Sequence, residues 1–185
     1  MNLLMWLDRR GAPFAQAIFE RQPEALLHFL EIHGAIPFAN DSLSHILHVR
    51  ELHPDIYEET VSFLEPVDFV TQRLTGITSG NLCTVFPMLL TDNRQTDATA
   101  YSKPLLEIAG IDEAKLPPLL PVDACVGPLR NEVAEELGIS AQTPVFSGMN
   151  DTQAVTLGAG AHRPGFGGLN IGTTMQVLAS APRKH

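Results

Sequence analysis

The sequence predicts an α/β fold, and two features carry that prediction. In the last third, short apolar segments at 122–126 and 144–148 flank a helical pattern at 131–137, with glycines at the joints. A strand, a helix and a strand in succession are typical of α/β proteins. The middle of the chain instead carries apolar residues at helical spacing, joined by short connections. With 44% hydrophobic and 18% charged residues among 185, the chain can bury a core of ordinary domain size.

The elements of the first half are predicted from apolar runs and boundary residues. The run at 2–8 predicts a buried strand that ends at a polar loop, because strands buried on both faces are continuously apolar. Proline suits the first helical turn and glycine often follows the last one. On these signals, helices are expected at 23–33 before Gly34, at 42–52, from Pro54, and from Pro66 to Gly76.

In the last third, Gly138 is expected to end the helix at 131–137. A helix of small residues is then expected at 150–161. Two further strands, at 169–171 and 176–179, flank a tight turn. The glycine-rich segment 163–168 between that helix and those strands is the best candidate for a domain boundary.

Composition excludes several classes of protein. The formal net charge is −9, so the chain repels polyphosphates at long range and is not expected to bind nucleic acid. The apolar runs are shorter than a membrane span, so no membrane association is expected. The two cysteines, Cys83 and Cys125, form no disulfide framework. A reducing cytoplasm is therefore the expected location.

Asp151 is the first candidate for chemistry. It follows the apolar segment 144–148 and begins a predicted helix, and the carboxyl ends of strands line the ligand crevice in open α/β sheets. A carboxylate there can accept a proton from a substrate hydroxyl. The alternative is that Asp151 only caps the helix, which is a common role for aspartate.

The second candidate is the turn Gly172-Thr173-Thr174 between the last two strands. Backbone amides and hydroxyls in such a turn can surround a phosphate, although an ordinary hairpin turn has the same sequence pattern. The Gly-x-x-x-x-Gly-Lys-Ser/Thr loop does not occur. The later glycines do not fall in the Gly-x-Gly-x-x-Gly order of dinucleotide-binding proteins.

Trp6 and Asp8 form the third candidate. An indole face can pack on a sugar ring while a carboxylate binds hydroxyl groups, and the alternative is a strand end with solvated charges. His45 and His48 are spaced to share a helix face, as metal ligands would. No cysteine or carboxylate completes a ligand set with them, so no metal-binding residue is assigned.

The order of the motifs resembles that of the FGGY family of carbohydrate kinases, most closely its xylulokinase-like members. The similar segments, in chain order, are Trp6-x-Asp8-x-Arg10, Pro54-Asp-Ile-Tyr57, Phe63-Leu64, Pro66-Val-Asp68-Phe69, Arg73-Leu-Thr-Gly76, Leu116-Pro117, Gly127, Glu132-Val-Ala134, Thr143-Pro-Val145, Gly148-x-x-Asp151, Gly158-x-Gly160 and Ile171-Gly172-Thr173-Thr174. The last motifs are the more specific ones, and together the segments cover nearly the whole chain.

The resemblance implies a ribonuclease H-like (actin-like ATPase) fold with a helical middle region. Residues 1–162 would be the later part of the N-terminal, sugar-binding domain. Residues 163–185 would be the first hairpin of the C-terminal, nucleotide-binding domain. It further implies ATP-dependent phosphorylation of a sugar or polyol, with D-xylulose favoured, and with ATP and Mg²⁺ required. Asp151 would be the catalytic base and touch the sugar with Trp6 and Asp8, while Gly172, Thr173 and Thr174 would bind the nucleotide.

The family pattern also contains an Asp-x-Gly-Thr type loop, and no such loop precedes Trp6 in this sequence. The chain is therefore expected to be an internal slice of a kinase, inactive alone. The alternatives are a non-catalytic sugar-binding or regulatory module and a truncated relic. A homodimer is left open.

Overall fold

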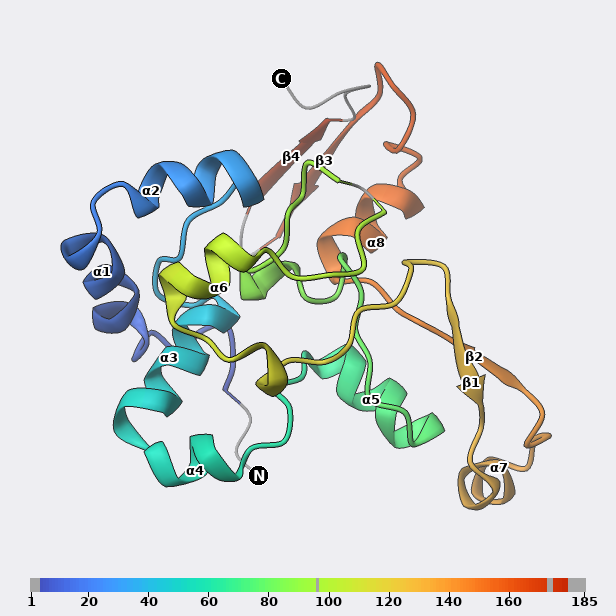
Figure 1. The fold of residues 1–185 in the computed structure, drawn as a ribbon. Helices are drawn as coiled ribbons and strands as arrows, with labels where there is room; N and C mark the ends of the chain where they lie inside the picture. Colours follow the sequence, from blue (N-terminus) through green and yellow to red (C-terminus); the bar gives the residue numbers. More distant parts are fainter. Residues whose placement is uncertain (1–3, 96, 173–174, 180–185) are drawn as a thin grey trace. The chain divides into compact units, whose positions relative to one another are not determined.

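The computed structural model describes residues 4–95, 97–172 and 175–179. The chain divides into two compact units, one ending at Gly148 and the other beginning at Met149. Figure 1 labels the helices and strands of both units.

The first unit is mainly helical up to residue 120. Its helices are α1 (Ala12–Arg21), α2 (Ala25–His28), the π-helix η1 (Phe29–His33), α3 (Ser42–Leu52), α4 (Pro54–Glu59), α5 (Pro66–Thr75), the 3₁₀-helix η2 (Phe86–Met88), α6 (Lys103–Ala109) and the 3₁₀-helix η3 (Glu113–Lys115). The four predicted helices are confirmed. The one expected at 23–33 is α2 continued by η1, and the one expected at 42–52 is α3 with the same bounds.

Local signals explain the helix boundaries. The carboxylate of Asp41 accepts a hydrogen bond from the backbone N–H of Ser44, 2.8 Å away, and so satisfies a free donor at the start of α3. Pro54 and Pro66 stand in the first turns of α4 and α5, where a missing N–H costs nothing.

The hydrophobic core lies among these helices and the loops between them. Its largest fully buried apolar side chains are Phe29, Ile18, Leu43, Leu47, Met88, Leu90, Leu105 and Val85. Helix α3 packs against α1 and α4, and α2 packs against α6, as Figure 1 shows for the blue, cyan and yellow-green helices. The core therefore joins residues from positions 18 to 119.

The buried strand predicted at 2–8 is wrong for residues 4–8. This segment is a turn in which Met5, Trp6 and Leu7 are each more than half exposed. A strand needs a hydrogen-bonded neighbour, and in the part of the chain that the structure describes no strand pairs with this segment. Residues 4–8 therefore form no buried strand.

Two α-helices were not predicted. Helix α1 begins at Ala12, within the stretch expected to be a polar loop after residue 8, and Pro13 occupies its first turn. Helix α6 likewise carries a proline, Pro104, in its first turn and ends at Gly110. Proline is common in loops and in the first turn of a helix, so Pro13 and Pro104 were also compatible with a helix start.

Between residues 121 and 148 the first unit contains a pair of short antiparallel strands. Strands β1 (Cys125–Pro128) and β2 (Pro144–Phe146) are antiparallel, and α7 (Asn131–Leu137) connects them. Helix α7 ends at Gly138, whose φ of 68° only glycine adopts without strain, as predicted. The first strand starts three residues later than expected. The pair is a two-stranded antiparallel ladder.

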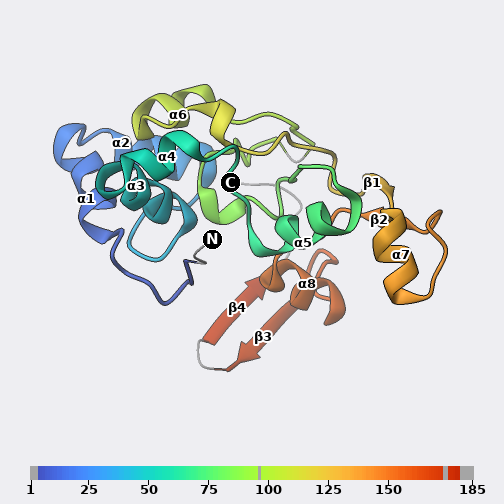
Figure 2. The same cartoon turned by 90° about the horizontal axis from the view of Figure 1, so that it is seen from below.

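The second unit contains α8 (Asp151–Gly158) and the antiparallel strands β3 (Gly167–Ile171) and β4 (Met175–Ala179). Figure 2 shows the two strands side by side. This confirms the helix and the strand pair predicted for this region. Thr173 and Thr174 lie outside the described residues. The domain boundary expected between 162 and 163 stays a prediction. None of the helices described is long and apolar enough to cross a membrane.

Candidate active site

Trp6 and Asp8 lie in a tight turn of the first unit, beside Arg10. The backbone N–H of Asp8 donates to the carbonyl of Met5 over 2.7 Å, which closes the turn. Trp6 is 53% exposed, so it is accessible to a ligand.

Arg10 holds the carboxylate of Asp8 through both oxygens. Its Nε lies 3.0 Å from each oxygen and its Nη2 lies 2.6 Å from Oδ2, while its backbone N–H donates to Oδ1 over 3.0 Å. These hydrogen bonds keep the pKa of Asp8 well below its ordinary value. Asp8 is therefore suited to accept hydrogen bonds from hydroxyl groups and is a poor proton acceptor.

Asp151 begins α8 in the second unit, and it is not the cap of that helix. The cap is Asn150, whose Oδ1 accepts a hydrogen bond from the N–H of Gln153 over 3.2 Å. The exposed carboxylate of Asp151 has the hydroxyl of Thr152 at 3.4 Å, and none of the ion pairs among the described residues includes it. The capping interpretation of Asp151 is therefore wrong, and its carboxylate is available for chemistry.

Gly172 follows the last residue of β3 and is exposed. It is the described part of the predicted phosphate-binding turn, whose other residues, Thr173 and Thr174, lie outside the described residues. Trp6 and Asp8 thus belong to the first unit, and Asp151 and Gly172 to different elements of the second.

A buried asparagine that sequence reasoning missed holds the end of the first unit. Asn81 is fully buried, and its Oδ1 accepts from the N–H groups of Cys83 and Thr84 at 2.8 and 3.1 Å. Its Nδ2 donates to the hydroxyl of Ser147 and, over 2.8 Å, to the carbonyl of Gly148. These bonds hold the last two residues of the first unit, Ser147 and Gly148, against the loop that carries Asn81. No local pattern around position 81 indicates them, because the partners are 66 and 67 residues away.

The comparisons with known proteins support one family over nearly the whole chain. The model of the FGGY family of carbohydrate kinases, N-terminal domain, matches residues 1–158. The chain belongs to the FGGY family of carbohydrate kinases. Its fold is accordingly part of the actin-like ATPase fold of these enzymes, as the sequence predicted.

Individual sugar kinases match over most of the chain. The chain is 28% identical to the xylulose kinase of Bacillus subtilis (strain 168) over 183 residues, 99% of this chain and 36% of that enzyme. It is 29% identical to the L-fuculokinase of Escherichia coli (strain K12), over 70% of this chain and 27% of that enzyme. The crystal structure of a xyloylose kinase from Brucella ovis superposes with a TM-score of 0.81 at 27% identity, over 95% of this chain and 34% of that one. The chain thus spans about a third of the length of these kinases.

The resemblance to FGGY kinases led to the expectation of Mg²⁺. No group of three or more His, Cys, Asp and Glu side chains among residues 4–95, 97–172 and 175–179 gathers to hold a metal ion. Instead, His45 and His48 are buried in the first unit. The residues that the structure describes therefore form no metal site of their own.

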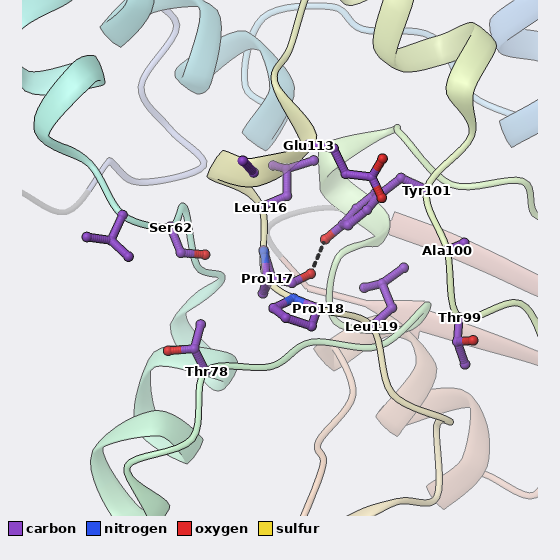
Figure 3. Close-up of a pocket in the computed structure, with 12 residues that line it drawn as sticks. Ser62, Thr78, Thr99, Ala100, Tyr101, Glu113, Leu116, Pro117, Pro118 and Leu119 are labelled. Atoms are coloured by element: carbon purple, nitrogen blue, oxygen red, sulfur yellow. Dashed lines mark hydrogen bonds between the residues drawn. The ribbon is translucent and has the colours of Figure 1, made fainter.

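The first unit contains a cavity of about 600 Å³, and none of the predicted site residues lines it (Figure 3). Tyr101, Pro117 and Leu119 line it, and the Tyr101 hydroxyl donates to the carbonyl of Pro117 over 2.9 Å. Because its buried hydroxyl is already paired, Tyr101 offers the cavity no free donor. The cavity is not part of the candidate site.

An Asn81→Asp variant is expected to lower the free energy of unfolding by about 2–4 kcal/mol, since buried polar groups lose their partners. The new carboxylate keeps the acceptors for Cys83 and Thr84 but has no hydrogen to donate to Ser147 or Gly148. Urea unfolding at pH 7.5 measures the loss. Asn93→Asp is the matched control, because Asn93 is less buried and its amide donates only to the carbonyl of His33. An equal loss in both variants would contradict the special role of Asn81.

Proposed function

We propose that this chain supplies the sugar-binding turn and the proton acceptor of a kinase that phosphorylates a sugar hydroxyl with ATP. The observation that carries the proposal is the exposed carboxylate of Asp151, which stands at the start of α8 without capping it, because Asn150 is the cap. Membership of the FGGY family supports the reaction class.

In the proposed reaction, the sugar hydroxyl oxygen forms a bond to the terminal phosphorus of ATP, and the bond between that phosphorus and ADP breaks. Asp151 accepts the proton that the hydroxyl loses. Phosphoryl transfer depends mainly on positioning and charge stabilisation, and one carboxylate is enough to orient the nucleophile. Gly172, Thr173 and Thr174 are proposed to contact the nucleotide phosphates.

Asp8 and Trp6 are proposed to bind the sugar. The Arg10 guanidinium keeps Asp8 ionised, so both of its oxygens accept hydrogen bonds and neither competes with Asp151 as base. The half-exposed indole of Trp6 offers an apolar face to the carbon-bound hydrogens of a sugar ring or chain.

A pentulose is the proposed substrate, with D-xylulose first. The relative from Bacillus subtilis that covers 99% of this chain is a xylulose kinase. The L-fuculokinase of Escherichia coli matches a smaller share, which makes L-fuculose the second choice. A cytoplasmic location and a homodimer remain predictions.

The test is an assay of ATP-dependent phosphorylation. The protein used is the whole polypeptide that the gene encodes. The panel contains D-xylulose, L-fuculose, D-gluconate and glycerol, and mass spectrometry identifies the phosphorylated product. We expect a sugar phosphate with D-xylulose as the preferred substrate. No product from any member of the panel would overturn the proposed reaction. Saturable sugar binding without turnover would instead favour a non-catalytic sugar-binding module.

A further inference from the structure

His45 of α3 connects the body of the first unit to the turn that carries Trp6 and Asp8. Its Nε2 lies 2.8 Å from the backbone carbonyl oxygen of Asp8, and its side chain is buried. A carbonyl oxygen only accepts hydrogen bonds, so Nε2 carries the hydrogen and donates it. The two residues are 37 positions apart, so this bond ties the turn to a helix formed later in the chain.

Gly11 shows independently that the turn lies against α3. A Cβ atom at Gly11 would overlap the backbone carbonyl of Ser44, the residue before His45. Because that carbonyl belongs to a helix, it has little room to move. The chain therefore approaches α3 closely at two adjacent points, Asp8 with His45 and Gly11 with Ser44.

The other bonds of the turn are local. Asp8 donates to Met5 and accepts from Arg10, which shapes the turn without fixing its place on the unit. Arg9 lies over the ring of Phe38, 5.5 Å from its centre, but Phe38 is 64% exposed and such contacts are weak in water. The buried bond from His45 is the stronger constraint on where Asp8 lies.

We propose that His45 is a positioning residue, which holds Asp8 and Trp6 at the place where they bind the sugar. The inference rests on the proposed function, in which these two residues contact the sugar. His45 acts through the backbone of Asp8 and touches no reacting atom. Loss of the bond should therefore weaken sugar binding and leave the chemical step at saturating sugar almost unchanged.

Trp6 is the single tryptophan of the chain, so its fluorescence reports directly on the turn. The variants are His45→Leu, which removes the donor, and His45→Gln, whose amide nitrogen can replace Nε2. His48→Leu is the matched control, because His48 is also a buried histidine of α3 but packs on Phe14 and His53. Acrylamide quenching and fluorescence anisotropy of Trp6 are measured at a temperature at which all variants are folded by circular dichroism.

We expect His45→Leu to raise the quenching constant of Trp6 roughly twofold and to lower its anisotropy, with His45→Gln and His48→Leu close to the parent. In the kinase assay, His45→Leu should raise KM for the sugar about tenfold, the factor that about one hydrogen bond supplies, with kcat changed less than twofold. The His45→Gln variant should restore most of the KM.

The fluorescence and kinetic results separate the two proposals. Quenching of Trp6 that is the same in His45→Leu and the parent, or that rises equally in His48→Leu, would overturn the role of His45. A loss confined to kcat would also overturn it. A changed Trp6 signal together with no phosphorylation of any sugar by the parent would support the positioning role and overturn the proposed kinase function.

Discussion

An Asp151→Asn variant is expected to phosphorylate its sugar roughly 10²- to 10⁴-fold more slowly than the parent, with little change in KM or in thermal stability. The amide keeps the size of the side chain but cannot accept the proton of the sugar hydroxyl. Because Asp151 is exposed and Asn150 caps α8, the substitution removes no bond that holds the helix. Initial rates at saturating ATP and sugar measure the effect.

Glu136→Gln is the matched control for this variant. Glu136 is an exposed carboxylate on α7, also a short helix, and it has no role in the proposed reaction. Its neutralisation changes the net charge by the same amount and should leave kcat within a factor of two. Full activity of Asp151→Asn, or an equal loss in Glu136→Gln, would assign the base to another residue.

The second large effect is expected at Asp68, a buried carboxylate on α5. Asp68 is 2% exposed, and its Oδ2 has no hydrogen-bond partner among the described residues. Burial, opposed by a hydrogen bond from Thr84 and aided by the nearby charge of Glu65, raises the pKa of Asp68 to about 7. At neutral pH the folded protein therefore carries a charge that it solvates poorly.

The direction of the pH dependence follows from the raised pKa. Below about pH 4 the carboxyl group is protonated in both the folded and the unfolded chain, so its ionisation does not lower the free energy of unfolding. Between about pH 4 and pH 7 the folded chain binds the proton more tightly, so stability falls as the pH rises. Above pH 7 the full cost of the buried charge is present.

Asp68→Asn should remove this cost. At pH 8 we expect the free energy of unfolding to increase by about 2 kcal/mol. The upper limit is about 4 kcal/mol, the free energy that corresponds to raising the pKa of Asp68 by roughly three. The gain should shrink as the pH falls towards 4. Urea unfolding at pH 4, 6 and 8 measures it, with the exposed Asp123→Asn as the control. An Asp68→Asn variant that is less stable than the parent at pH 8 would show that the charge is compensated in the folded chain.

Much of the helical structure was predictable because its signals are local. Asp41 with Ser44, Pro54, Pro66 and Gly138 each act within one helical turn, so the sequence nearby is enough to place the helix ends. The buried strand at 2–8 failed for the opposite reason. A strand is stabilised by a neighbour elsewhere in the chain, and apolar character alone does not provide one.

The candidate site likewise has a part that the sequence predicted and a part that only the structure shows. The motif order along the chain was enough to predict the FGGY family and to select Asp8, Trp6 and Asp151, because a family is encoded in which residues occur and in what order. The structure showed which contacts these residues make. Arg10 binds the carboxylate of Asp8 and keeps it an anion, and Asn150 takes the capping role in place of Asp151, both through contacts within three positions of the chain.

The sequence by itself therefore determined the family, most helices and the identity of the candidate base. Only the tertiary structure placed His45 on the backbone of Asp8, Asn81 on Ser147 and Gly148, and Asp68 in a buried site where no described residue partners its Oδ2. The first two contacts join residues 37 to 67 positions apart, and burial depends on every element packed around a residue. Interactions of that range arise when the core forms, and no local pattern specifies them.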